Sequence, residues 1–211
     1  MTAVGRSGGQ AVGGGVALVV LILYPTTRLS AQISLQVAAG VRYSSTLVHD
    51  SIVAPFDVRP ALAPVAAITV AGPRERSWTP TVTLDFSMSN LERHDRDGTT
   101  ATLGQVTTIA FTVGLTRPLP GGFSASIGVG GLKYLPSDDT GIFRSGSGAI
   151  AGVGALTLGH PFPIGGQRLT LAARYDIHGF TTPALEDEGF HGLRAVHRVA
   201  LTLRSDWDAG R

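Results

Sequence analysis

Apolar and polar residues alternate along the chain after residue 32, in eight successive stretches of about ten residues. The stretches span residues 33–44, 61–71, 78–90, 105–116, 123–134, 148–158, 168–178 and 193–207. Successive side chains of a β-strand point to opposite faces, so this period of two predicts eight strands. The stretch 148–158 carries Gly and Ala on both faces and has the weakest pattern.

The gaps between the stretches are alternately long and short. The long gaps are 45–60, 91–104, 135–147 and 179–192, and the short gaps are 72–77, 117–122 and 159–167. Long loops at one end of the strands and tight turns at the other are typical of an up-and-down barrel in an outer membrane.

The two faces of the stretches differ in chemistry. In 78–90 one face is Trp78, Pro80, Val82, Leu84, Phe86 and Met88, whereas the other carries Thr, Ser and Asp85. A water-facing surface would normally carry dense mixed charge, but these polar faces are mostly small and uncharged. A membrane barrel turns its apolar face to lipid and its polar face to the lumen, and 9–11 residues suffice for each tilted strand.

The sequence therefore predicts an all-β fold, an eight-stranded antiparallel up-and-down transmembrane β-barrel. An even number of strands with both ends on the short-turn side closes the sheet and removes its edges. A secreted soluble lipocalin-like ligand carrier would also alternate and is kept as an alternative. The early Gly-x-Trp signature of that family is absent, because the first tryptophan is Trp78.

The N-terminal segment has a different pattern. Nine consecutive apolar residues span 16–24, fewer than the roughly 20 that a membrane-spanning helix needs. Small residues precede Gln32, as at a signal-peptidase site. We therefore expect residues 1–31 to be a signal peptide and 32–211 to be the barrel domain, with an uncleaved anchor as the alternative.

Charge and cysteine content narrow the possible functions. The chain has 17 Lys and Arg, 15 Asp and Glu, and no Cys. Loss of residues 1–31 would remove Arg6 and Arg28 and leave 15 basic against 15 acidic residues. A neutral mature chain gives no support for nucleic-acid binding. The lack of Cys excludes disulfides and a lipid-anchored lipoprotein.

Three aromatic residues are predicted to lie at the short-turn end of the barrel. Trp78 and Phe123 open their strands, and Trp207 closes the last one. Aromatic rings of this kind favour the interface between membrane and water. We therefore expect Trp78, Phe123 and Trp207 to form one aromatic girdle.

Charged residues on the polar faces are the main candidates for a site inside the barrel. They are Arg42, Asp85, Arg174, Asp176, Arg198 and Arg204, with Asp206 beside the last. The interior of an eight-stranded barrel is just wide enough for side chains to fill it, and a lone buried charge is costly. We expect a salt-bridge network that blocks the lumen, in which Asp85 pairs with Arg174 or Arg198. A gated ion or proton path is the alternative.

The pattern resembles the small eight-stranded outer-membrane barrels, the class typified by the OmpA transmembrane domain and OmpX. The last strand, 197–207, looks like the C-terminal assembly signal of such barrels, although it ends in Trp207 rather than Phe and four residues follow. The resemblance implies the outer membrane of a Gram-negative-type bacterium. It also implies contact with outer-membrane lipid, recognition of the last strand by the assembly machinery, and a monomer.

The expected function is a non-enzymatic envelope-structural or surface-interaction role through the long extracellular loops, where a ligand could bind. No catalytic, cofactor or metal motif is evident, and Asp95–Gly98 is interpreted as a polar turn. Ile142-Phe143 and Pro55-Phe56 are interpreted as loop-packing residues, with adhesive contact as the alternative. The rival function is a lipid A-modifying enzyme on the same scaffold. Its candidate groups are His178 with Asp176, and His49 with Asp50 and Ser51.

Overall fold

A computed structural model describes residues 33–50, 55–143, 149–164, 167–189 and 192–208. The expected signal peptide lies outside these residues. The strands are β1 (Ser34–Ser44), β2 (Val48–Asp50), β3 (Phe56–Pro60), β4 (Ala63–Ala71), β5 (Thr79–Asp95), β6 (Thr100–Pro118), β7 (Ser124–Pro136), β8 (Ile150–Ile164), β9 (Gln167–Phe180) and β10 (Arg194–Asp208). A 3₁₀ turn, η1 (Pro120–Gly122), and a short helix, α1 (Pro183–Asp187), complete the described elements. Among these residues no helix is long and apolar enough to cross a membrane.

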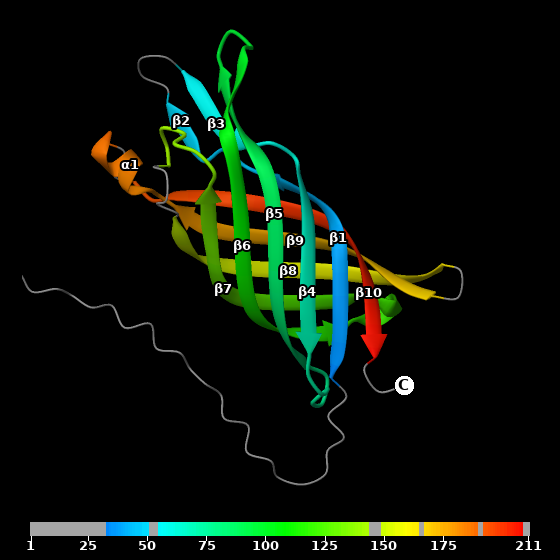
Figure 1. Cartoon of the computed structure of the whole chain (residues 1–211). Coiled ribbons are helices and arrows are strands. Elements are labelled where there is room, and N and C mark those ends of the chain that lie inside the picture. The colour runs from blue at the N-terminus through cyan, green and yellow to red at the C-terminus, as the bar shows by residue number, and fades with distance from the viewer. Residues whose placement is uncertain (1–32, 51–54, 144–148, 165–166, 190–191, 209–211) are drawn as a thin grey trace, which may run out of the picture. The chain divides into compact units, whose positions relative to one another are not determined.

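Eight of the strands form a closed antiparallel barrel, as the sequence predicts. From β4 to β10 each strand pairs with the next along the chain, and β1 pairs with both β4 and β10. Figure 1 shows the closure where β1, in blue, lies beside β10, in red. Residues 150–158 of the weakly patterned stretch belong to a full barrel strand, since β8 pairs with β7 on one side and β9 on the other.

The outward face of the barrel is apolar. On β5, Val82, Leu84 and Phe86 point outward and are 40%, 49% and 46% exposed, whereas Asp85 between them is 1% exposed. Similar alternation on the other barrel strands produces a continuous apolar exterior. This exterior is the arrangement expected of a surface that faces lipid rather than water.

Small residues line much of the lumen and let the strands approach one another closely. A Cβ atom built on Gly130 would lie 1.8 Å from the carbonyl oxygen of Phe111 on the neighbouring β6, so no side chain fits there. A Cβ atom on the adjacent Gly131, which is exposed, would have no other atom within 4 Å. Glycines inside a strand often mark such close backbone approaches.

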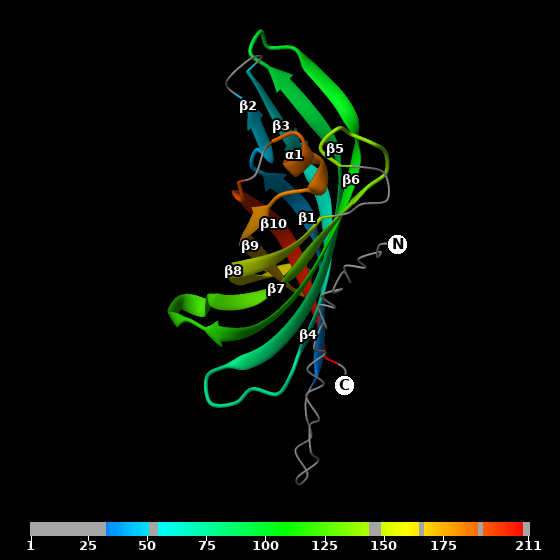
Figure 2. The same ribbon diagram turned by 90° about the vertical axis from the view of Figure 1, so that its left-hand side faces the viewer.

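The connections at the long-gap end are more ordered than the sequence analysis expects. The gap 91–104, expected as a loop, is instead the outer part of a hairpin in which β5 and β6 are joined by residues 96–99 (Figure 2). Its tip contains the polar turn at Asp95–Gly98, in which Gly98 has φ of 86° and Gly98 N–H donates to Asp95 O over 3.0 Å. β5 and β6 continue beyond the apolar exterior of the barrel. There both faces of a strand can be in contact with water, so the sequence need not alternate between apolar and polar residues.

Two other gaps contain secondary structure. Gap 45–60 holds β2 and β3, and β3 extends the sheet by pairing with the outer part of β5. Gap 179–192 holds α1, whose first turn is capped by Thr182 Oγ1, which accepts from the Leu185 N–H over 3.2 Å. Three of the four long gaps, which the sequence predicts to be loops, therefore contain regular secondary structure.

Candidate functional site: a lumen blocked by two chemistries

Asp176 is the centre of a group of charged side chains at mid-height in the lumen. Its Oδ1 accepts from Arg174 Nε over 2.7 Å, and its Oδ2 accepts from Arg198 Nη2 over 2.8 Å. Arg198 lies directly opposite Asp176 in the pairing of β10 with β9, so the strand register itself positions this pair. Arg42 Nη2 lies 3.8 Å from the same carboxylate.

Asp85 supplies the second carboxylate. Arg42 Nη1 on β1 donates to Asp85 Oδ1 over 2.7 Å, and Arg174 Nη2 lies 3.5 Å from Oδ2. β4 lies between β1 and β5, so the Arg42 side chain extends across β4 to make this contact. The expected pairing of Asp85 with Arg174 is present as the longer contact. Arg198 pairs with Asp176 rather than Asp85, and the shortest contact of Asp85 is to Arg42.

These five residues, Arg42, Asp85, Arg174, Asp176 and Arg198, are called the charge layer below. Four of them are 1–2% exposed, and Arg174 is 12% exposed. Two carboxylates compensate three guanidinium groups, so the layer carries a formal charge of +1. Charges buried this deeply are tolerated only when they are paired and hydrogen-bonded, and the contacts above provide that pairing across the width of the barrel.

Arg204 does not belong to the charge layer. Its Nε lies 3.6 Å from Asp206 Oδ1, and Asp206 is 39% exposed near the short-turn end of β10. The sequence analysis groups Arg204 with the luminal charges because it shares their face of the strand. Arg204 is distant from the charge layer because of its height along β10, where it lies six residues beyond Arg198, toward the rim.

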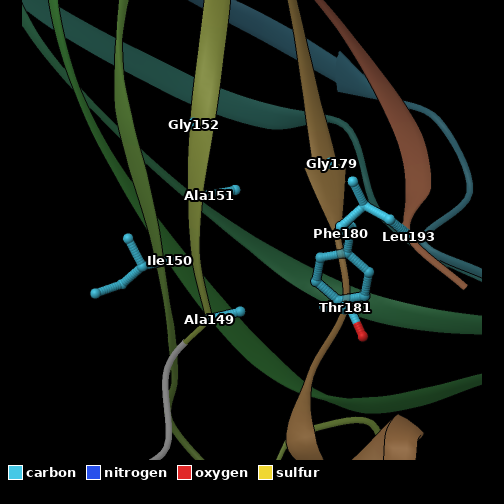
Figure 3. Close-up of a pocket in the computed structure, with 8 residues that line it drawn as sticks. All are labelled: Ala149, Ile150, Ala151, Gly152, Gly179, Phe180, Thr181 and Leu193. Atoms are coloured by element: carbon cyan, nitrogen blue, oxygen red, sulfur yellow. The ribbon is translucent and has the colours of Figure 1, made fainter. Parts of the chain in front are cut away.

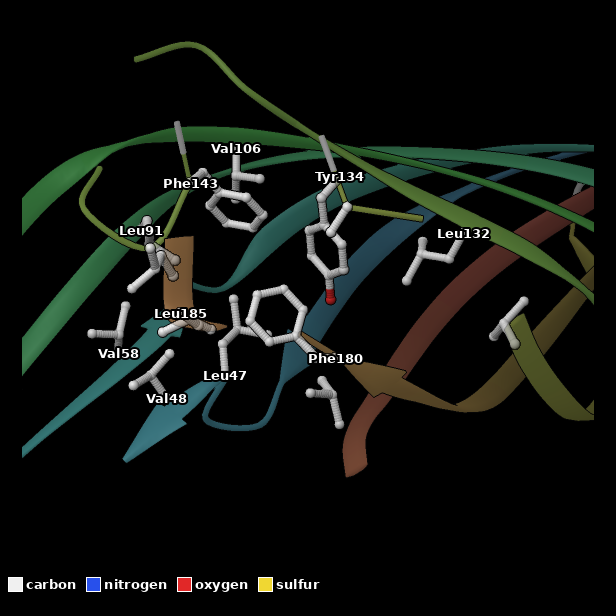
Figure 4. Close-up of a cluster of buried hydrophobic side chains, with 14 of the residues drawn as sticks. Leu47, Val48, Val58, Leu91, Val106, Leu132, Tyr134, Phe143, Phe180 and Leu185 are labelled. Carbon is white, nitrogen blue, oxygen red and sulfur yellow. The ribbon is translucent and has the colours of Figure 1, made fainter. Parts of the chain in front are cut away.

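A second group of buried side chains, apolar this time, fills the lumen at the long-connection end. This group, called the apolar plug, consists of Leu47, Val48, Val58, Leu91, Val106, Ala110, Leu132, Tyr134, Ile142, Phe143, Ala149, Val153, Phe180, Leu185 and Val196. Figure 4 shows the rings of Tyr134, Phe143 and Phe180 converging at its centre. Their centroids are 5.3–5.7 Å apart, within the range of favourable aromatic pairs.

Seven of the fifteen members of the apolar plug come from connections between barrel strands, and the other eight lie on the barrel strands themselves. Leu47, Ile142 and Phe143 lie between strands, and Leu185 lies on α1. Phe143 and Thr140 exchange hydrogen bonds across a turn, and Thr182 Oγ1 donates to the Ile142 carbonyl over 2.6 Å. Ile142 and Phe143 are 8% and 0% exposed. The loop-packing interpretation of this pair thus agrees with the structure.

A hydrogen bond lies at the boundary between the two groups. The Tyr134 hydroxyl lies 2.7 Å from His178 Nε2, between the apolar plug and the charge layer. Ser87 and Thr108, also at this boundary, hydrogen-bond to each other over 2.7 Å. Polar contacts of this kind satisfy groups that the lumen has removed from water.

The histidines are placed differently from the arrangement that the enzyme hypothesis needs. His178 bonds to Tyr134, whereas the Asp176 carboxylate accepts from arginines. His49 Nδ1 lies 2.7 Å from Asp57 Oδ1 on the neighbouring β3, and Ser51 is outside the described residues. In the described part of the chain, no group of three or more His, Cys, Asp or Glu residues could hold a metal ion.

The expected girdle residues lie at the short-turn end. Trp78 is 39% exposed and lies beside Arg117, whose guanidinium carbon is 5.7 Å from the indole centroid. Phe123 is 41% exposed, with its ring centroid 4.5 Å from that of His160. The backbone of Trp207 pairs with Leu35 at the same end, and its side chain lies outside the described part of the structure.

The sequence predicts the faces of the charge layer, but of the apolar plug it predicts only the packing of Ile142 and Phe143. Every member of the charge layer lies on a strand whose alternation predicts its luminal face. The loop members of the plug have no such period. The available signal was the presence of Ile142 and Phe143 within a connection, 135–147, that is otherwise rich in polar residues and Gly.

Comparison with known proteins gives a match at the level of fold. No family model matches the sequence, and no curated protein sequence matches it significantly. Among solved structures, the chain is similar to Neisserial surface protein A, with a TM-score of 0.53, 10% identity, and coverage of 83% of this chain and 96% of that one.

Two further outer-membrane proteins match less closely. AlkL has a TM-score of 0.47, 12% identity, and coverage of 90% of this chain and 97% of its own. Ail of Yersinia pestis has a TM-score of 0.44, 13% identity, and coverage of 83% and 99%. The closed barrel, its apolar exterior and the match to Neisserial surface protein A lead to one conclusion: the chain has the fold of the small eight-stranded outer-membrane β-barrels.

Proposed function

We propose that this protein is a non-enzymatic integral outer-membrane barrel with a closed lumen, and that it acts through the structures at its long-connection end. The observation that carries the proposal is the pairing of an apolar exterior with a lumen filled at two levels. The first feature suits a protein surrounded by lipid. The second suits a scaffold rather than a channel.

The arrangement of the connections supports an orientation in the membrane. Bacterial outer-membrane barrels have short periplasmic turns and longer extracellular loops. By that rule the β5–β6 hairpin, β2, β3 and α1 face outward from the cell. Residues 1–31 serve as the signal peptide, the last strand is read by the assembly machinery, and the barrel is a monomer.

The β5–β6 hairpin is the element best suited to an envelope-structural or surface-interaction role. Its outer part is held by a continuous ladder from Glu92–Thr102 to His94–Thr100, and Arg93 Nε donates to Asp95 Oδ1 over 2.8 Å. Arg93 also covers the Phe56 ring of β3 at 4.4 Å, which fixes the hairpin to its neighbour. Because this charged hairpin is already rigid, a partner that binds to its surface would cost it little conformational entropy.

Two measurements test the proposal. In membrane fractions, we expect an outer-membrane band whose gel mobility changes on boiling, because a folded barrel resists the detergent until it is heated. In planar phosphatidylcholine bilayers, the purified protein should produce no steady conductance, because both luminal layers block the path. A soluble periplasmic protein would overturn the membrane assignment, and steady unit conductance would overturn the closed lumen.

The non-enzymatic part of the proposal has a test of its own. Mass profiles of lipid A from cells with and without the gene should be identical, since the two candidate histidines, His178 and His49, contact Tyr134 and Asp57. A mass difference equal to an acyl chain would favour the lipid A-modifying enzyme instead.

A further inference from the structure

The barrel wall separates between β8 and β9 at the long-connection end. The pairing of β8 with β9 ends at Val153–His178. Beyond it, β8 continues to Ile150 while paired with Lys133 of β7, and β9 continues to Phe180 while paired with Arg194 of β10. The two strands therefore diverge, and each remains hydrogen-bonded only to its other neighbour.

A cavity of about 280 Å³ lies at this separation. Figure 3 shows its walls, with Ala151 and Gly152 on β8, and Ala149 just before this strand, facing Gly179 and Phe180 on β9, and with Leu193 reaching over Gly179. No charged side chain lines the cavity. Its outer edge is formed by Ile150 and Leu193, which are 77% and 74% exposed, so it opens onto the apolar exterior.

A second cavity, of about 330 Å³, lies against the same two side chains, Phe180 and Leu193. It is lined by Leu47, Val48 and Leu185 of the apolar plug, with His49 and Arg194 as its charged or titratable members. The two cavities adjoin at Phe180 and Leu193 and are together called the wall groove, which is apolar on the barrel side and has Arg194 at its outer rim. Ligand sites commonly have volumes of about 300–1,000 Å³ and combine apolar walls with few polar groups.

The basic group at the rim is Arg194. Its side chain is exposed, and among the described residues no side-chain hydrogen bond or ion pair engages its guanidinium group. His49, in contrast, already contacts Asp57 at 2.7 Å. An arginine fork binds a carboxylate with two parallel N–H···O bonds, a geometry that lysine cannot reproduce.

We propose that the wall groove binds a free long-chain alkyl carboxylate. The tail lies between β8 and β9, against Phe180 and Gly152, and the carboxylate accepts hydrogen bonds from Arg194. A single anionic group on an unbranched apolar chain matches a groove with one free guanidinium at one end and apolar walls at the other. The inference goes beyond the proposed function, because it depends on the separated strands and not on the role of the hairpin.

The test uses the full barrel in phosphatidylcholine nanodiscs and palmitate with a diazirine at its terminal carbon. After illumination, peptide mapping should locate the label on residues 149–152 or 179–181. Unlabelled palmitate should compete with the probe, whereas methyl palmitate should compete about fivefold less well, because a charge-assisted hydrogen bond is lost at a solvent-screened site. Label spread evenly around the apolar exterior would overturn the proposal, since that is the pattern of surrounding lipid.

Two glycines on β8 provide a matched pair of variants. Gly152→Phe should fill the cavity and reduce labelling at least fivefold; a Cβ at Gly152 meets no atom within 4 Å, so the substitution has room. Gly154→Phe adds the same ring to the same face two residues away, where a Cβ makes only an ordinary 3.6 Å contact with Ile177, and should leave labelling unchanged. Equal labelling of the two variants would refute the site.

A further variant tests the carboxylate. Arg194→Gln should abolish the difference between palmitate and methyl palmitate while the label stays at the same peptides. If the two competitors were equal with wild-type protein, the anionic ligand would be excluded. The boiling-dependent gel shift of each sample shows separately whether the barrel is folded, so a failed barrel is distinguished from a failed site.

Discussion

The charge layer and the apolar plug block the same lumen, yet they differ in what holds them in place. The charge layer is built entirely from the barrel strands, with Arg198 and Asp176 set opposite each other by register. The apolar plug draws Phe143 and Leu185 from connections that fold inward. The charge layer is stabilised by directional hydrogen bonds and ion pairs between side chains of a rigid wall. The apolar plug is stabilised by burial of apolar surface, which has no preferred direction. A rigid wall can hold a costly charged group in one geometry, but loops are better held by contacts that tolerate adjustment.

Removal of a carboxylate from the charge layer should have the largest effect. Asp176→Asn leaves three buried guanidinium groups with Asp85 alone, so we expect the free energy of unfolding to fall by about 3–5 kcal/mol. Urea titration of the barrel in liposomes, followed by tryptophan fluorescence, measures it. The matched control is Asp206→Asn, which breaks a longer contact at the rim and should cost about 0–1 kcal/mol. Equal losses would show that burial does not distinguish the two sites.

Truncation within the apolar plug should cost somewhat less. Phe143→Ala removes a fully buried ring, and we expect a loss of about 3 kcal/mol, at the low end for buried phenylalanine because its connection can relax into the space. The same urea titration applies. Leu62→Ala, at a side chain that is 66% exposed, should change stability by less than about 0.5 kcal/mol. A Phe143→Ala loss above that of Asp176→Asn would reverse the comparison.

The rigidity of the wall around the charge layer can be tested at one pair of glycines. Gly130→Ala places a Cβ against the Phe111 carbonyl, so β6 and β7 must move apart, at a cost of about 2 kcal/mol. Gly131→Ala introduces the same group into open space and should be neutral or slightly stabilising. The difference between their urea midpoints is the measurement. Two equal midpoints would mean that the wall yields easily.

The smallest effect is expected at the boundary between the two regions. Tyr134→Phe keeps the ring of the apolar plug but removes the hydroxyl that contacts His178, which should cost about 1 kcal/mol. Tyr43→Phe is the control, because Tyr43 is exposed and its hydroxyl has no hydrogen bond to a described residue. The thermal midpoint of the boiling-dependent gel shift should fall for the first variant only. An unchanged midpoint for Tyr134→Phe would show that the contact with His178 does not stabilise the barrel.

The limits of sequence reasoning follow the same division between wall and connections. Alternation predicted the barrel and the luminal face of Arg42, Asp85 and Asp176, because a strand has a fixed period. It predicted the partner of Asp85 less well, since which charges meet across a lumen depends on the tilt and stagger of strands far apart in sequence. Arg204 shows the same limit, because the face of the strand on which a residue lies does not determine its position along the barrel axis.

In the connections, the two-residue alternation of apolar and polar residues no longer predicts the structure. The gap 91–104 is expected as a loop because it lacks apolar alternation. A strand in water does not need an apolar face, however, and the Asp-Gly turn at the tip continues the hairpin. Gly152 and Gly179 carry no pattern that predicts the separation of β8 from β9.

The sequence by itself determined that the chain forms an eight-stranded closed barrel with an apolar exterior and charges inside, because these properties depend on a residue's own strand. Only the tertiary structure decided which arginine meets which aspartate, that the connections fold inward to form the apolar plug, and where the wall opens. Each of these depends on contacts between segments distant in sequence, whose geometry is set by closure of the barrel rather than by any local pattern.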